Sequence, residues 1–126
     1  LEPTMTLGQI CQSAVSISDI VFQAMSPSLL LAVMNDAANP REFFVEHHAS
    51  DGIAPFLKQA QLDGELSQTA DLAEISSTFE AVVYSASRFW AMELINAEER
   101  NQRIHTGLKL ALLAYATPRG RTSLTD

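Results

Sequence analysis

Helix-start signals, each followed by apolar residues at helical spacing, recur along this chain. Thr6 and Gln9 have the spacing of a capping box, in which two side chains satisfy backbone N–H groups of the first turn. Residues 39–42, Asn-Pro-Arg-Glu, combine an N-cap residue, a proline at the first helical position and an acidic third residue. Asp71 and Asn96 have the same capping character. These signals constrain the chain to fold mainly as helices.

The start signals and the helix breakers between them predict about five helices. Pro27 opens the second helix, and Gly52 and Pro55 interrupt the third, since proline removes a backbone donor and crowds the preceding turn. Pro118 and Gly120 break the last helix. Strand signals are nearly absent, because no Asn-Gly or Asp-Gly turn separates alternating apolar runs. We expect an all-α, about five-helix bundle forming one domain over residues 1–126, with helices over 6–25, 27–37, 39–64, 71–95 and 96–117.

The composition is that of a folded acidic domain. The 126 residues include 8 Lys or Arg and 15 Asp or Glu, which gives a net charge of −7, and 47% are hydrophobic. An acidic surface repels phosphate backbones, so these residues should bind nucleic acid poorly. The single Cys11 excludes a disulfide framework and zinc modules that need two or more cysteines. No apolar run approaches the roughly 20 residues of a membrane-spanning helix, so no membrane partner is expected.

Two predicted helices carry more apolar surface than one core-facing stripe requires. On the 71–95 helix one arc is apolar and the opposite arc is small, aromatic or weakly polar. In the 96–117 helix the polar first turns give way to residues 108–115, which are apolar nearly all round. This pair should either line an internal cavity or pack against a second copy of the chain; a tight monomeric core is the alternative. The candidate dimer interface comprises Phe89, Trp90, Gly107, Leu108, Ala111, Leu112 and Tyr115.

Aromatic and methionine side chains with a few polar neighbours favour a small-molecule pocket, because such pockets are mostly apolar with few polar groups. These side chains are distributed over three predicted helices. Arg88 is the one basic residue on the 71–95 helix and is either a ligand anchor or a surface or subunit contact. The candidate pocket comprises Phe22, Met25, Phe43, His47, Phe56, Tyr84 and Arg88.

Catalytic and metal-binding patterns are weak. His47 and His48 lie beside Glu46, but adjacent residues on a helix point about 100° apart and cannot chelate as residues four apart do. Cys11 lies within an apolar stripe, as an inert core thiol does. The sequence contains no nucleophile elbow, phosphate-binding glycine loop or dinucleotide fingerprint. We therefore expect no enzymatic activity, no metal and no cofactor.

Three motifs follow one another between Ile53 and Tyr115, a stretch of about half of the chain. Pro-Phe-Leu-Lys-Gln-Ala-Gln-Leu-Asp-Gly-Glu-Leu, over 55–66, precedes a short loop that ends at Asp71. Tyr-Ser-Ala-Ser-Arg-Phe-Trp lies over 84–90, and Gly-Leu-Lys-Leu-Ala-Leu-Leu over 107–113. This order resembles the C-terminal effector-binding and dimerisation domain of TetR-family transcriptional regulators.

The resemblance implies that the last two helices pack against those of a second subunit as a four-helix bundle. It also implies an effector pocket among the preceding helices and the inner face of the 71–95 helix. Residues 6–36 contain no Lys or Arg and no helix-turn-helix segment is present, so operator DNA would be contacted only through a domain outside this chain. The start at Leu1 favours a removed DNA-binding half over a free-standing relative.

The resulting expectation is a ligand-sensing, homodimerising domain of a cytoplasmic transcriptional repressor, with a small, largely apolar effector. The first alternative is a stand-alone helical adaptor whose doubly apolar helices bind another protein. The second is a small helical-bundle metalloenzyme that uses His47 and Glu46.

Overall fold

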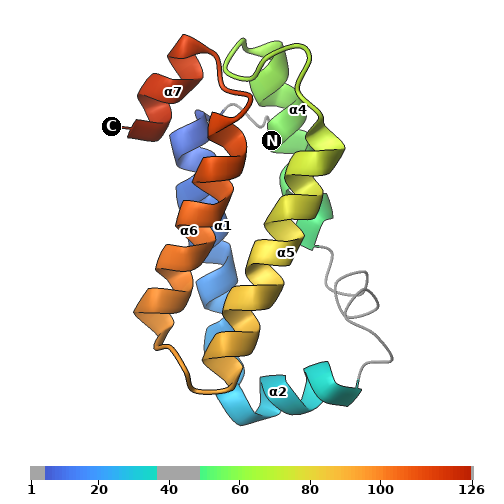
Figure 1. Cartoon of the computed structure of the whole chain (residues 1–126), viewed down its shortest axis with the longest axis vertical. Coiled ribbons are helices and arrows are strands. Elements are labelled where there is room, and N and C mark those ends of the chain that lie inside the picture. The colour runs from blue at the N-terminus through green and yellow to red at the C-terminus, as the bar shows by residue number, and fades with distance from the viewer. Residues whose placement is uncertain (1–4, 37–48, 126) are drawn as a thin grey trace.

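Six helices run through the part of the chain that the computed structural model describes, residues 5–36 and 49–125 (Figure 1). Within these residues there is no sheet, and the β pairing is limited to an isolated antiparallel bridge between Leu66 and Ala116. The all-α prediction is therefore confirmed, and the helix start predicted at residues 39–42 lies outside the described ranges. The helices are α1 (Leu7–Gln23), α2 (Pro27–Asp36), α4 (Ala49–Leu62), α5 (Leu72–Ala91), α6 (Ala97–Leu113) and α7 (Pro118–Thr125).

The predicted N-terminal caps of three helices are confirmed. At α1, Thr6 Oγ1 accepts the Gln9 N–H at 3.2 Å, and Gln9 Oε1 accepts the Thr6 N–H at 2.9 Å. At α6, Asn96 and Glu99 form the same reciprocal pair of hydrogen bonds, at 2.8 and 3.1 Å. Asp71 caps α5 through its side chain. These starts depend on residues three apart in sequence, which is why the local pattern located them.

The predicted interruption at Gly52 and Pro55 is wrong, and the predicted break at Pro118 and Gly120 is correct only in that α6 ends before Pro118. α4 continues through Gly52 and Pro55. Pro55 lies on the exposed side of α4. α6 ends at Leu113, earlier than the predicted Thr117, and Pro118 begins a further helix, α7, because proline is tolerated at the first helical position. Thr117 caps this helix, with its hydroxyl oxygen accepting the Gly120 N–H at 3.2 Å.

α5 ends at Ala91, earlier than the predicted Ile95. The Glu93 N–H donates to the Trp90 carbonyl and the Leu94 N–H donates to the Phe89 carbonyl, both at 2.9 Å. This pair of hydrogen bonds is a Schellman motif, which requires a left-handed residue just after the helix. Glu93 fills that position with φ of 61°, a conformation that glycine usually supplies.

Replacing Glu93 with glycine is expected to stabilise the chain by about 0.5–1 kcal/mol, because it removes a left-handed strain of about 1–2 kcal/mol at some cost in unfolded-chain entropy. Urea unfolding followed by circular dichroism measures the change. Glu93→Ala is the matched control, since it removes the same charge and keeps the strain. Equal stability of the two variants would contradict this explanation.

Four helices, α1, α4, α5 and α6, lie side by side, while α2 crosses one end of the bundle and α7 the other (Figure 1). α5 packs against both α4 and α6, and α1 packs against α6. Leu57, Ile104 and Leu108 are fully buried between them. Cys11 is buried as well, and this burial raises the pKa of its thiol to about 11, so the thiol is protonated and unreactive near neutral pH.

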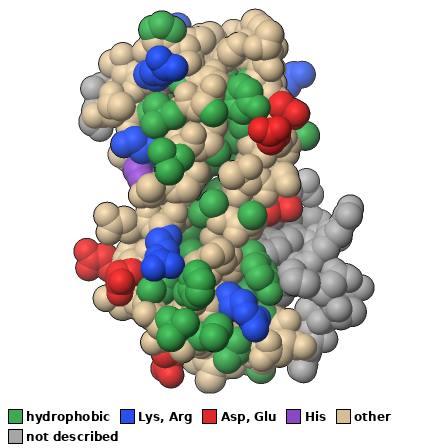
Figure 2. Space-filling view, in the orientation of Figure 1, with side chains coloured by type: hydrophobic (Ala, Val, Ile, Leu, Met, Phe, Trp, Pro, Cys, Tyr) green, Lys and Arg blue, Asp and Glu red, His purple; other side chains and the backbone are tan. Residues whose placement is uncertain are grey.

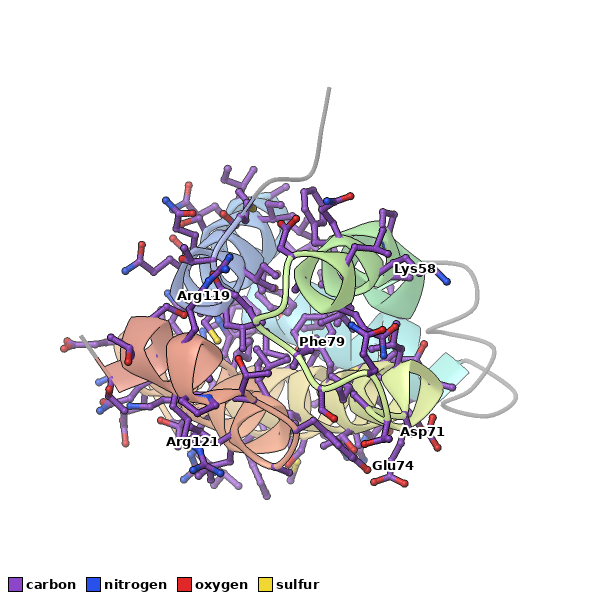
Figure 3. The ribbon with its side chains drawn as sticks, turned by 90° about the horizontal axis from the view of Figure 1, so that it is seen from above. Lys58, Asp71, Glu74, Phe79, Arg119 and Arg121 are labelled. Atoms are coloured by element: carbon purple, nitrogen blue, oxygen red, sulfur yellow. The ribbon has the colours of Figure 1, made fainter. Side chains whose placement is uncertain are left out.

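The buried carboxylate of Glu65 fastens the α7 end of the bundle, which Figure 3 shows from above. Glu65 Oε1 accepts the Leu7 N–H at 3.0 Å, at the start of α1, where the helix dipole favours a negative charge. The Ser123 hydroxyl of α7 donates to the same oxygen at 3.1 Å. At Gly120, α7 lies so close to the Glu65 carbonyl oxygen that a Cβ would overlap it. α7 is thus docked on α1 and on the loop after α4.

Candidate functional site

An apolar cavity of about 310 Å³ lies between α1, α4 and α5. Phe79 of α5 projects into the middle of the bundle, whereas Lys58, Asp71 and Glu74 lie toward its periphery (Figure 3). The lining that the structure describes contains no charged side chain, and its polar side chains are those of three serines. The walls include Ile10, Ser13, Ser18 and Phe22 from α1, Ile53 and Phe56 from α4, and Phe79, Val83 and Ser87 from α5.

The two faces of α5 have different environments. Phe79, Val83 and Ser87, spaced four residues apart, face the cavity. Ser87 is buried in this apolar wall because its hydroxyl donates to the Val83 carbonyl of its own helix. Ala81 and Ser85 face the other way and are exposed. α5 therefore separates the cavity from the outer surface that it shares with α6.

A shallow groove of about 590 Å³ runs along that outer surface, between α5 and α6. Small side chains, among them Ala81 and Ser85, form its α5 side, and Glu99 and Arg103 supply charges from α6. Gly107 brings the two helices together within the chain, because a Cβ there would lie 2.6 Å from Val82 Cγ1. Figure 2 shows hydrophobic side chains gathered on one face of the bundle, with charged groups scattered among them. The exposed large hydrophobic residues of α5, its C-cap and α6 are Phe89, Met92 and Leu110.

An ion pair between the buried Arg100 of α6 and the half-buried Asp19 of α1 lies beside the cavity, and the Trp90 ring of α5 packs on it. The Arg100 side chain, 2% exposed, donates to Asp19 Oδ1 at 2.6 Å and to Asn101 Oδ1 at 3.0 Å. Its guanidinium carbon lies 4.5 Å from the centre of the Phe22 ring and 4.6 Å from that of the Trp90 ring. Burial lowers the pKa of Arg100, and the Asp19 carboxylate acts in the opposite direction.

The structure brings together part of the predicted pocket. Phe22, Met25 and Phe56 line the cavity. Tyr84 and Arg88 are not part of the described cavity lining. Tyr84 is half-buried beside the core. Arg88 donates from Nη1 to Asn35 Oδ1 of α2 at 3.4 Å. The remaining two predicted pocket residues, Phe43 and His47, lie outside the described residues.

The predicted dimer interface is also divided. Leu108 and Leu112 are fully buried in the core of the chain, so no partner can contact them. This placement corrects the prediction: the chain's own helices cover that side of α6. Trp90 is half-buried against Phe22, 5.5 Å between ring centres. The other four residues, Phe89, Gly107, Ala111 and Tyr115, are at least partly exposed. The Phe89 ring lies beneath the Arg103 guanidinium, and Gly107 lines the groove. The Tyr115 hydroxyl donates to Glu74 Oε1.

The described residues contain neither a metal-binding cluster nor a single membrane-spanning helix. No group of three His, Cys, Asp or Glu side chains there is placed to hold a metal ion. No single helix among these residues is long and apolar enough to cross a membrane; α1 and residues 27–35 reach those limits only together, bent by 94° at their junction.

Comparison of the chain with protein-family models, curated proteins and solved structures gave no significant match.

Proposed function

We propose that this chain is an effector-binding and homodimerisation domain of the TetR type, which binds a small, uncharged, largely apolar molecule in its cavity. The observation that carries the proposal is the position of α5, with the apolar cavity on one face and the open α5–α6 groove on the other. A helix shared in this way lets occupation of the cavity alter the surface offered to a second copy. Ligand and partner would then be linked thermodynamically.

The lining supports the ligand class. A charged ligand would lose its hydration without gaining a counter-charge, since the described walls carry none. The volume of about 310 Å³ lies at the small end of the range for small-molecule sites. Ser13 and Ser18 offer hydroxyls to a ligand that carries one polar group.

The outer face supports the partner. Ala81, Ser85 and Gly107 are small, so a helix of a second copy can approach the α5–α6 groove closely. Two copies related by a two-fold axis would pair α5 and α6 as a four-helix bundle. Glu99 and Arg103 lie on the same groove, so the axis can bring opposite charges of the two copies together. Operator DNA would be bound by a helix-turn-helix domain outside these residues.

Sedimentation velocity tests the dimer. We expect the 13.8 kDa chain to sediment as a dimer at micromolar concentration, and Ala81→Arg to raise the dimer dissociation constant at least about tenfold by placing unpaired charge in the contact. Ala54→Arg is the matched control, because Ala54 is also exposed but lies on α4, away from the groove. A wild-type monomer, or equal dissociation constants for the two variants, would contradict the proposed interface. A monomer that binds only a foreign protein would favour the adaptor alternative.

A further inference from the structure

The Phe22 side chain is part of both the cavity wall and the cluster around Arg100. Its ring forms part of the cavity wall, and it also covers the Arg100 guanidinium at 4.5 Å. Among the described aromatic rings, Phe22 and Trp90 cover Arg100, and of these two only Phe22 lines the cavity. A ligand in the cavity therefore meets, at Phe22, a side chain that is already part of the ion-pair cluster.

Arg100, a residue of α6, contacts Phe22 and also binds α1. Its guanidinium is bound to Asp19 of α1 and to its neighbour Asn101, whose amide donates to the same Asp19 oxygen at 3.1 Å. A buried charge depends on every group that covers or neutralises it, so moving one aromatic ring changes the energy of the whole cluster. Because Arg100 follows Glu99 of the outer groove in sequence, the cluster and the groove share the first turns of α6.

We propose that Phe22 is the positioning residue through which occupation of the cavity is communicated to Arg100 and so to the start of α6. This inference rests on the proposed function, because it requires a ligand in the cavity. The bound ligand favours one position of the Phe22 ring. That position determines how completely the ring covers the Arg100 guanidinium. A shift of Arg100 then changes the position of the first turns of α6. An effector with different affinities for the two arrangements shifts the population between them.

Trp90 makes the proposal measurable. It is the one tryptophan of the chain, it lies outside the cavity lining, and its ring is 5.5 Å from Phe22 and 4.6 Å from the Arg100 guanidinium. Its fluorescence therefore reports on the cluster without direct contact with a cavity ligand. The probe is 1-octanol, which is uncharged, carries one hydroxyl and neither absorbs nor emits in the tryptophan range.

The experiment combines calorimetric titration with 1-octanol, which measures binding, and Trp90 emission during the same titration, which measures communication. In the wild-type chain we expect binding heat and a saturable change in Trp90 emission with the same dissociation constant. Because Phe22 and Phe56 both line the cavity, each leucine variant is expected to bind 1-octanol with its own dissociation constant, which calorimetry measures, and the variants are compared at saturation. At saturation Phe22→Leu should show no change in Trp90 emission, whereas the matched control Phe56→Leu should show the wild-type change.

Each outcome distinguishes the two claims. Binding without any change in wild-type Trp90 emission would overturn the role of Phe22 and leave the ligand-binding proposal standing. A full emission change in Phe22→Leu would also overturn it. Absence of binding heat in the wild-type chain would contradict the proposed function and, with it, this inference. The wild-type titration alone can overturn the role of Phe22, even if a variant fails to fold.

Discussion

Replacing Arg100 with alanine is expected to lower the free energy of unfolding by about 3 kcal/mol, because it removes one partner of a buried ion pair. The substitution leaves the Asp19 carboxylate without its counter-charge and opens a space between the Phe22 and Trp90 rings. The loss is placed at the lower end of the range for buried pairs because Asp19 is 32% exposed and water can reach it. Urea unfolding followed by circular dichroism measures the loss.

Two companion variants separate the causes. Arg103→Ala removes a guanidinium from an exposed position on the same helix, 5.3 Å from the Phe89 ring, and should cost less than about 1 kcal/mol. Arg100→Met keeps an unbranched apolar filling between the rings and should lose less than Arg100→Ala. Similar losses for Arg100→Ala and Arg103→Ala would show that the buried cluster contributes no more to the free energy of unfolding than an exposed arginine does.

Replacing Gly120 with alanine should destabilise the chain by about 3 kcal/mol, because overpacking against rigid backbone leaves no side chain free to move aside. The added Cβ would overlap the Glu65 carbonyl oxygen and lie 2.9 Å from Leu7 Cδ1. α7 must then move away from Glu65, which breaks the hydrogen bond between Ser123 and Glu65 at the start of α1. Urea unfolding measures the loss, and hydrogen exchange of α7 shows whether that helix has detached.

Gly52→Ala is the matched control. Gly52 lies within α4 at the cavity wall, and no atom of the described residues lies within 4 Å of the position that a Cβ would take, so the same substitution should stabilise the chain by about 0.5–1 kcal/mol. Opposite signs for the two glycines would confirm that close packing, and not helix propensity, decides the effect at Gly120. Wild-type stability in Gly120→Ala would disprove the docking of α7.

The sequence predicted the features that depend on near neighbours. The caps at Thr6, Asp71 and Asn96 involve side chains three residues from the groups that they satisfy. The end of α5 was missed because Glu93 occupies a left-handed position that its side chain does not favour. α7 was missed because Pro118 serves both as a stop and as a first helical residue.

The candidate site was predicted only in part because the rotation of α5 is set by its neighbours. Both arcs of that helix are apolar or weakly polar, so the pattern could not choose between Tyr84 with Arg88 and Val83 with Ser87 as the cavity face. Arg100 shows the same limit. It follows two glutamates in a polar first turn, and its burial depends on Asp19, a partner 81 residues earlier in the chain.

The most direct test of the account is to locate an apolar ligand inside the cavity. Methyl resonances of isoleucine can be followed by nuclear magnetic resonance while 1-octanol is added. Ile10 and Ile53 line the cavity, whereas Ile75 and Ile104 are buried elsewhere in the core. We predict saturable shifts at Ile10 and Ile53 with one dissociation constant, and unchanged resonances at the other two. Unmoved resonances at all four, or equal shifts across them, would contradict the cavity as the binding site.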